Sequence, residues 1–377
     1  MGIQRIQLFN KVYYFSAPAR CSRQVRSIGT PGGGCCSYHT VPVVSKLLTP
    51  WIRSGIQLQR CNLSSHSKSA SSGKQNDGIH SETVRTVAKW IQDLEKQGLP
   101  KIIVLCGAGV SVAAGIPDFR SPGTGLYDNL QKYNLPYPEA VFDLDYYRQR
   151  PQAFLSLAKE IWPGVQEQHS PTLTHSFLAL LEQNNLLLRC YTQNIDGLEF
   201  LGGMSSDKIM ECHGHFRSAS CIRCGSPADI EKVKESILQQ QGTPMCEQCH
   251  IGHVKPDIVF FGEALPPRLN LLIQNDLPRA SLMLILGTSL QVVPVSLIPD
   301  WVPSSCRRVL LNRELVGNLA IGTGSHPNEK SRDLFQAGDC DDSILAICRA
   351  LGWEDLLRKQ NEATRIRATA TTTMDAK

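Results

Sequence analysis

Four cysteines have the spacing of metal ligands. They form two Cys-x-x-Cys pairs, Cys221 with Cys224 and Cys246 with Cys249, and 21 residues separate the pairs. Each short turn can aim two thiolates at one point, and two such turns complete a tetrahedral shell of four sulfurs around zinc. A redox dithiol is the alternative, but neither pair opens a helix directly after a strand. We therefore predict a structural zinc site whose closed shell leaves no coordination position open for catalysis.

A glycine-rich segment follows an apolar run near the start of the body of the chain. Residues 107–111 read GAGVS after the run Ile102–Leu105, and glycines placed there let backbone N–H groups approach a phosphate closely. The fingerprint of hydride-transferring enzymes is incomplete, because its third glycine would fall at Val112. No acidic residue ends a second strand about 20 residues further on. The segment therefore predicts a phosphate-bearing ligand, without a reversible redox site.

Other polar residues stand where later apolar runs end. Asn194 and Asp196 follow the run 186–191, and His213 comes shortly afterwards. An imidazole titrates near neutral pH and can act as a general base, whereas Asn and Asp are also common in ordinary strand-end turns. Taken alone, these residues indicate a site at a sheet edge and leave its reaction open.

The elements that must position these residues alternate between strands and helices. An apolar stripe predicts a first helix over 77–98, with Ser81 as its N-cap, and the last helix runs about 343–351. Between them we predict short buried strands at Ile102–Leu105, Leu186–Tyr191, Ile258–Phe261, Leu282–Leu286 and Val309–Leu311. This order is typical of an α/β fold with a doubly wound, mostly parallel, Rossmann-like sheet. Ligands of such sheets bind beyond the carboxyl ends of the strands, where the polar residues stand.

The body is expected to divide into a large part and a smaller lobe. Residues 143–185 look helical and residues 212–256 carry the cysteine pairs, so together they should form the smaller lobe, a helical insertion plus the zinc module. The large, ligand-binding part then comprises about 77–142, 186–211 and 257–353. A loose C-terminal tail is expected over 354–377, because its end is rich in Thr and Ala without periodicity.

The first 76 residues differ in composition from everything that follows. They contain ten Lys or Arg and no Asp or Glu, while the remainder has 29 basic and 34 acidic residues. An Arg- and Ser-rich stretch without acid predicts a mitochondrial transit peptide over 1–76, with a disordered basic arm as the alternative. A mildly acidic body argues against a strong grip on nucleic acid, and no apolar run is long enough to cross a membrane. In a reducing compartment such as the mitochondrial matrix, paired cysteines indicate metal before disulfides.

Several of these motifs occur together in the order of a known family. The motifs are residues 107–120 and 192–196, the His213-Gly214 pair, the cysteine pairs, 255–263 (KPDIVFFGE) and 287–290 (GTSL). They resemble the motifs of the sirtuin family of NAD-dependent protein lysine deacylases. The resemblance covers about 82–353, nearly the whole body. The segments 121–127 and 135–140 look most like the animal mitochondrial deacetylase subgroup, which agrees with the tail.

The resemblance implies a reaction that consumes NAD. The acyl oxygen of a modified lysine would displace nicotinamide from the ribose, and the acyl group would end on ADP-ribose. The catalytic residues would be His213, as the base for a ribose hydroxyl, with Asn194 orienting a hydroxyl or water and Asp196 holding the nicotinamide amide. His215, two residues on, departs from the family pattern and is expected to face solvent.

The resemblance also implies which residues bind NAD and the protein substrate. The cofactor-binding residues would be Gly107, Ala108, Gly109, Ser111, Gly115, Asp118, Phe119, Arg120, Tyr127, Gln193, Asn194, Ile195, Asp196, Gly287, Thr288, Ser289, Asn312, Arg313, Glu314, Asp339 and Cys340. The substrate-binding residues would be Val259 and Phe260, which wall an apolar tunnel for the lysine, and the peptide edges Gly262, Glu263, Leu290, Gln291 and Val292. An acetyl-lysine protein would bind between these edges as an extended peptide.

Acyl specificity is expected to favour acetyl and other uncharged groups. Family members that remove succinyl or malonyl groups carry a Tyr-x-x-Arg pair soon after the Phe-Arg, and residues 121–142 contain no Arg. Tyr147 and Arg150 have that spacing but come later, in the helical insertion. Two other functions stay open: a mono-ADP-ribosyltransferase that uses the same NAD cleavage, and a non-catalytic scaffold that binds NAD or zinc.

Overall fold

The computed structural model describes residues 82–375 except 122, 166–168 and 322–330. The expected transit segment 1–76 and the expected N-cap Ser81 lie outside the described residues. The described part starts with helix α2 (Glu82–Glu95), which buries the expected stripe from Val84 to Leu94. No helix of this part is both long and apolar enough to cross a lipid bilayer.

The centre of the fold is a six-stranded parallel sheet, which confirms the expected fold class. Its strands lie in the order β3-β2-β1-β7-β8-β9. They are β1 (Ile102–Cys106), β2 (Leu187–Thr192), β3 (Ile209–Glu211), β7 (Leu282–Leu286), β8 (Arg307–Asn312) and β9 (Asp333–Ala337). The chain order reverses between β1 and β7, and the crevice beyond such a switch point is where doubly wound sheets bind ligands.

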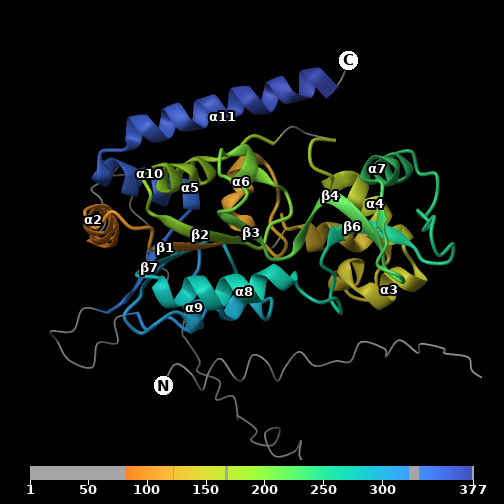
Figure 1. Cartoon of the computed structure of the whole chain (residues 1–377), viewed down its shortest axis with the longest axis horizontal. Helices are drawn as coiled ribbons and strands as arrows, with labels where there is room; N and C mark the ends of the chain where they lie inside the picture. Colours follow the sequence, from red (N-terminus) through yellow and green to blue (C-terminus); the bar gives the residue numbers. More distant parts are fainter. Residues whose placement is uncertain (1–81, 122, 166–168, 322–330, 376–377) are drawn as a thin grey trace, which may run out of the picture. The chain divides into compact units, whose positions relative to one another are not determined.

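Helices cover both faces of the sheet, because alternate residues of its strands point in opposite directions. On β1, Val104 packs toward one core cluster and Leu105 toward the other. Figure 1 shows α10 (Cys340–Leu351) and α5 (Leu173–Gln183) on one face, and α8 (Pro267–Asp276) with α9 (Ile298–Trp301) on the other. The sheet is therefore buried on both sides, as its nearly continuous apolar strands require.

The smaller lobe has its own sheet and core. Its antiparallel strands lie in the order β5-β4-β6, with β4 (Gly214–Cys221), β5 (Pro227–Ala228) and β6 (Val254–Ile258). Helices α3 (Leu144–Gln149), α4 (Gln152–Ile161) and α7 (Ile230–Leu238) accompany this sheet, together with 3-10 turns at Leu126–Tyr133 and Pro138–Phe142. The lobe is thus built from a helical insertion and the cysteine module, as expected (Figure 1).

Three expectations about the elements are wrong. The apolar run Ile258–Phe261 is no strand of the main sheet: β6 ends at Ile258 and pairs with β4, and Phe260 fills the core of the lobe. Helix α5 was expected in the smaller lobe, yet Phe177 and Leu181 pack in the core of the main sheet, because both faces of this helix are apolar. The turn Leu126–Tyr133 belongs to the lobe instead.

The expected loose tail over 354–377 is a helix, α11 (Glu354–Asp375). Its side chains Leu357 and Thr364 are almost completely buried. Hydrogen bonds from Gln360 to the Gly202 carbonyl and from Asn361 to the Pro171 carbonyl tie it to the loops next to α5 and α6 (Leu198–Leu201). Packing of a few side chains therefore orders a segment whose composition shows no strong apolar face.

Candidate active site

The loops after β1 and β7 touch through their backbones. Gly107 and Gly109 donate hydrogen bonds to the carbonyls of Leu286 and Gly287, at 3.0 and 2.8 Å. A Cβ on Gly109 would lie 2.7 Å from Gly287 Cα, and one on Gly107 would lie 2.6 Å from Thr288 Cβ. Only glycine allows this approach of the two loops, whereas the expected contact of their backbone with a phosphate stays a prediction.

A hydrogen-bonded network joins the residues that follow β1 to those that follow β2. Ser111 is fully buried, and its hydroxyl donates to Asp196 Oδ2 at 2.8 Å. Asn194 donates through Nδ2 to the Ser111 hydroxyl at 3.3 Å and to the Gly107 carbonyl at 3.2 Å. Gln193 reaches across to Thr288 Oγ1 at 2.9 Å. The structure therefore brings six expected site residues together at the switch point of the sheet.

His213 lies beside this network in a defined tautomer. Its Nδ1 is 3.0 Å from the backbone carbonyl of Gln193, and a carbonyl can only accept, so Nδ1 carries the proton. The lone pair is then on Nε2. Burial lowers the pKa of His213, although the hydrogen bond to Gln193 partly opposes this effect. A neutral imidazole with its second nitrogen unprotonated is the form that can act as a general base at neutral pH.

The neighbouring histidine, His215, was expected to face solvent but is only partly exposed. His215 is half-buried, and its Nδ1 is enclosed without a hydrogen-bond partner among the described residues. Strand β4 explains the difference, since Gly214 to Phe216 alternate between buried and half-buried positions along it. No hydrogen bond of the described residues links His215 to the network around Asp196.

The segment around Phe119 is held by a carboxylate. Asp118 accepts hydrogen bonds from the backbone N–H groups of Arg120 and Ser121, at 2.9 and 2.7 Å. Burial by itself would raise the pKa of Asp118, but the hydrogen bonds from Ser121 and Arg120 bring it below its usual value. Phe119 packs 5.7 Å from the Tyr127 ring, and the Arg120 guanidinium lies over that ring at 5.3 Å. Asp118 therefore acts on the loop, which orients Phe119 and Arg120.

The expected adenosine-side residues follow β8 and β9. Asn312 donates to the Glu314 carbonyl at 2.8 Å, and exposed Arg313 pairs with Asp339 at 2.5 Å. Cys340 opens α10 with a buried side chain directed at the Leu311 carbonyl, so only its backbone can face a ligand. Three further residues expected to bind the cofactor lie outside these two loops. Ser289 is half-buried after β7, and Gly115 ends a 3-10 turn at φ +89°. Ile195 packs against the core of the smaller lobe.

The expected substrate residues divide into buried and accessible ones. Phe260 is 1% exposed and packs against the rings of Phe142, Tyr147 and Phe154, so its side chain supports the lobe and does not wall a tunnel. Half-buried Val259 remains available, as do Gly262, Glu263, Leu290, Gln291 and Val292. Tyr147 is also buried, and its hydroxyl donates to the Val254 carbonyl at 2.9 Å.

Sequence reasoning gave no role to Lys255, which the structure places under the peptide edge. Lys255 is 4% exposed, and its ammonium lies 2.9 Å from Glu263 and donates to the Ile258 carbonyl at 2.6 Å. Burial lowers its pKa, although Glu263 opposes the shift. Glu263 in turn accepts from the Phe260 N–H at 2.7 Å. A lysine shortly before the apolar run Ile258–Phe261 was the available signal, because buried lysines require a partner.

The four cysteines converge as a zinc site requires. Their sulfurs all lie within 4.8 Å of one another, and the Sγ atoms of Cys221 and Cys249 and those of Cys224 and Cys246 are each 3.7 Å apart. A tetrahedral shell with zinc–sulfur bonds of about 2.3 Å separates its sulfurs by about 3.8 Å. A hydrogen bond with Ser226 lowers the pKa of Cys224 to about 6, whereas burial raises the pKa of Cys221 to about 11, so the fit rests on the distances between the sulfurs. The donor set therefore fits a structural zinc.

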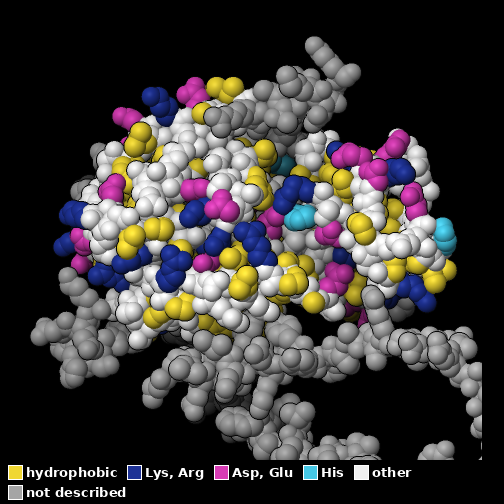
Figure 2. All heavy atoms as spheres, in the orientation of Figure 1, with side chains coloured by type: hydrophobic (Ala, Val, Ile, Leu, Met, Phe, Trp, Pro, Cys, Tyr) yellow, Lys and Arg dark blue, Asp and Glu magenta, His cyan; other side chains and the backbone are white. Residues whose placement is uncertain are grey.

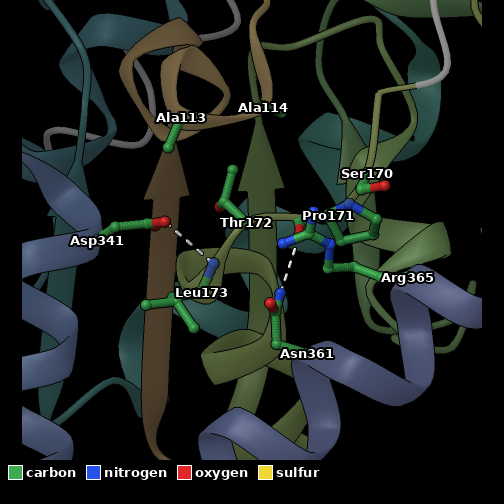
Figure 3. Close-up of a pocket in the computed structure, with 9 residues that line it drawn as sticks. All are labelled: Ala113, Ala114, Ser170, Pro171, Thr172, Leu173, Asp341, Asn361 and Arg365. Atoms are coloured by element: carbon green, nitrogen blue, oxygen red, sulfur yellow. Dashed lines mark hydrogen bonds between the residues drawn. The ribbon is translucent and has the colours of Figure 1, made fainter.

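A small pocket lies beside the glycine loop, outside the expected site residues. It encloses about 250 Å³ and is lined by Ala113, Ala114, Ser170, Pro171, Thr172, Leu173, Asp341, Asn361 and Arg365. Figure 3 shows Asp341 of α10 and Asn361 of α11 directed at the loop that leads into α5. Asp341 accepts from the N–H groups of Leu173 and Thr174, at 3.1 and 2.9 Å. The pocket is thus bounded by groups that fix the start of α5.

Comparison with known proteins agrees with the geometry. Residues 107–294 match the model of the Sir2 family. The chain is 46% identical over 270 residues to "NAD-dependent protein deacetylase hst2" of Schizosaccharomyces pombe, covering 71% of this chain and 77% of the relative. It is 42% identical to "NAD-dependent protein deacetylase sirtuin-2" of Danio rerio, covering 68% and 70%. It is 41% identical to "NAD-dependent protein deacetylase sirtuin-3" of Mus musculus, covering 77% and 84%.

These relatives are long and similar enough to decide the family. The matched region contains the glycine loops, the network of Ser111, Asn194 and Asp196, His213 and the four cysteines. The chain belongs to the Sir2, or sirtuin, family.

Proposed function

We propose that the protein is an NAD-dependent protein lysine deacetylase whose base is His213. NAD is consumed as a co-substrate: acetyl-lysine, NAD and water give lysine, nicotinamide and O-acetyl-ADP-ribose. The observation that carries this proposal is the tautomer of His213. With its proton on Nδ1 and bonded to the Gln193 carbonyl, Nε2 can accept a proton from a ribose hydroxyl, which then attacks the acyl carbon.

The first chemical step depends on other residues. The acyl oxygen is a weak neutral nucleophile, so displacement of nicotinamide requires close positioning and stabilisation of a cationic sugar. Asp196 is held by Ser111 and by the Leu198 N–H, and we assign its carboxylate to the nicotinamide amide. Asn194 would orient a ribose hydroxyl or water, and Phe119 would cover the nicotinamide. The glycine-rich loop and Thr288 would hold the phosphates through backbone and hydroxyl donors.

The protein substrate is inferred to bind as an extended peptide. The segments 262–263 and 290–292 consist of exposed or half-buried residues, and main-chain hydrogen bonds to a peptide there would be largely independent of the peptide sequence. An uncharged acyl group fits this chain, because buried Tyr147 is committed to the Val254 carbonyl and residues 121–142 supply no Arg. Basic and acidic side chains are interspersed on the face drawn in Figure 2, without an extended patch of one sign.

The decisive experiment is mass spectrometry of the products formed from NAD and an acetyl-lysine peptide. Deacetylated peptide, nicotinamide and O-acetyl-ADP-ribose should appear in equal amounts. Nicotinamide release without acetyl-peptide, with ADP-ribose appearing on an acceptor protein, would indicate ADP-ribosyl transfer instead. A succinyl-lysine peptide is the matched control and should react much more slowly.

We further infer that the protein acts in the mitochondrial matrix. The support is the acid-free basic composition of residues 1–76. Fusion of residues 1–76 to a fluorescent reporter should give a mitochondrial signal and a shortened product. A diffuse signal at full length would overturn this assignment without touching the proposed chemistry.

A further inference from the structure

A buried ammonium group lies next to one of the expected peptide edges. Lys255 is 4% exposed. Three acceptors surround its Nζ, namely Glu263 Oε2 at 2.9 Å and the carbonyls of Ile258 and Pro256 at 2.6 and 3.2 Å. An ammonium has three N–H groups and a neutral amine has two, so these surroundings fit the charged form. All three donors are then bound to the protein itself, which leaves none for a reacting group.

The carboxylate that balances this charge also closes a turn. The Glu263 N–H donates to the Phe260 carbonyl at 2.9 Å, and Glu263 Oε2 accepts from the Phe260 N–H at 2.7 Å. Gly262 has φ +94°, which suits the third position of a tight turn and favours glycine. The Lys255 ammonium therefore holds this segment at two points, the Ile258 carbonyl and the far end of the turn.

Other backbone groups of the segment are bound to the site and to the smaller lobe. The Val259 N–H donates to the His213 carbonyl at 2.8 Å. The Phe261 N–H donates to the Phe142 carbonyl, also at 2.8 Å. By contrast, the structure shows no hydrogen bond from any described residue to the N–H or the carbonyl of exposed Gly262. These two groups remain for a ligand that pairs with the segment as an added strand.

We propose that Lys255 is a positioning residue for the protein substrate: its ammonium, paired with Glu263, fixes the segment 258–263 so that the backbone of Gly262 pairs with the substrate peptide. The inference rests on the proposed function and deepens it, because it adds a buried residue that acts through the groups that would touch the peptide. Removal of the ammonium leaves two carbonyls and a carboxylate without their donor, and such buried groups are costly unless they move to another partner. The peptide edge would then lose its register with the peptide.

The test starts from Lys255→Met, whose side chain has a similar length but no ammonium. Exchange of labelled nicotinamide into NAD is measured against the concentration of an acetyl-lysine peptide, because this reaction precedes the proposed step of His213. We expect the half-saturating peptide concentration to rise by about 10- to 30-fold, as the loss of two ordinary hydrogen bonds would give. The KM for NAD should stay unchanged.

Acetyl-lysine with both ends blocked is the matched substrate control. It has no neighbouring residues that could pair with the edge, so its half-saturating concentration should change far less than that of the peptide. A wild-type value for the peptide, or an equal rise for the two substrates, would overturn the positioning role. Product analysis of the wild-type protein is run alongside, and an absence of deacetylated peptide there would contradict the proposed function instead.

Two further variants separate positioning from stability. Lys255→Met combined with Glu263→Gln removes the unpaired carboxylate, so it should melt closer to the wild type than Lys255→Met alone. Its half-saturating peptide concentration should stay raised, because the Ile258 carbonyl still lacks its donor. If Lys255→Met does not fold, this double variant decides the matter. Recovery of peptide binding together with the melting temperature would contradict the proposal.

Arg308→Met is the control for the loss of a buried cation elsewhere. Arg308 lies on β8 and is also 4% exposed. Its replacement should lower the melting temperature and leave the half-saturating peptide concentration at the wild-type value. A rise as large as that in Lys255→Met would show that peptide binding merely follows stability, and the proposal would then be wrong.

Discussion

Replacement of Gly214 by alanine should disable the enzyme through a displacement of His213. Gly214 has φ +77°, a conformation that costs a residue with a side chain about 1–2 kcal/mol. A Cβ there would also run into the Asp257 carbonyl and lie 3.0 Å from Ile258 Cα, so the β4–β6 pairing at Gly214 has to open. The backbone must move by roughly 1 Å, and misplacement on that scale costs about 100-fold in rate.

The assay compares turnover of an acetyl-peptide with nicotinamide exchange in Gly214→Ala. Because the proposed role of His213 begins after nicotinamide has left, exchange should survive much better than turnover. Gly164→Ala is the matched control, since Gly164 has the same φ of +77° and nothing within 4 Å of an added Cβ. It should share the strain and retain turnover. Equal turnover in the two variants, each still containing zinc, would refute the argument.

Other predictions concern His213, the zinc and a buried ion pair. His213→Ala should lower turnover by about two to four orders of magnitude, which a comparison of its turnover rate with that of the wild-type protein measures. Wild-type turnover should decline only below about pH 6.5, because the lowered pKa of His213 keeps the ring unprotonated above that pH; a pH profile of turnover measures this. Chelation of zinc, or Cys221→Ser, should melt the smaller lobe and abolish turnover, as followed by metal analysis and circular dichroism. Arg308→Met should lower the free energy of unfolding by about 3–5 kcal/mol, as measured by denaturant unfolding. The reason is that Asp333, which is 1% exposed and 2.6 Å from the guanidinium, would be left buried without its partner. Asp333→Leu in the same chain should recover much of the loss.

Local patterns in the sequence predicted the centre of this fold well. The strand Ile102–Cys106 and the glycines after it are contiguous, so their spacing alone specifies a strand and a close turn. The run Ile258–Phe261 was wrongly predicted to be a strand of the main sheet, because a short apolar run has the same pattern whether it joins a sheet or fills the core of a lobe. Helix α11 escaped prediction because few of the side chains that the structure describes in it, such as Leu357, are fully buried.

The active-site residues were predictable to the extent that motifs are local. Ser111, Asn194 and Asp196 stand in short recognisable segments, and the structure joins them by hydrogen bonds. The closeness of His175 and Glu199 to Asp196 was not predictable, because these residues come together only when α5 and α6 pack in the folded chain. The pattern Thr172-x-x-His175 before an apolar helix was the one available signal, since it is the spacing of a helix cap.

The touching loops after β1 and β7 have a consequence for inhibitor selectivity. Where Gly107, Gly109 and Gly287 meet, a ligand encounters backbone atoms and no side chains that could differ between related proteins. A compound confined to that surface would therefore discriminate poorly within the family. Side chains that can vary begin further out, at exposed Arg313 and Glu314. An inhibitor selective for this protein would have to extend to Arg313 and Glu314, or to the peptide edges.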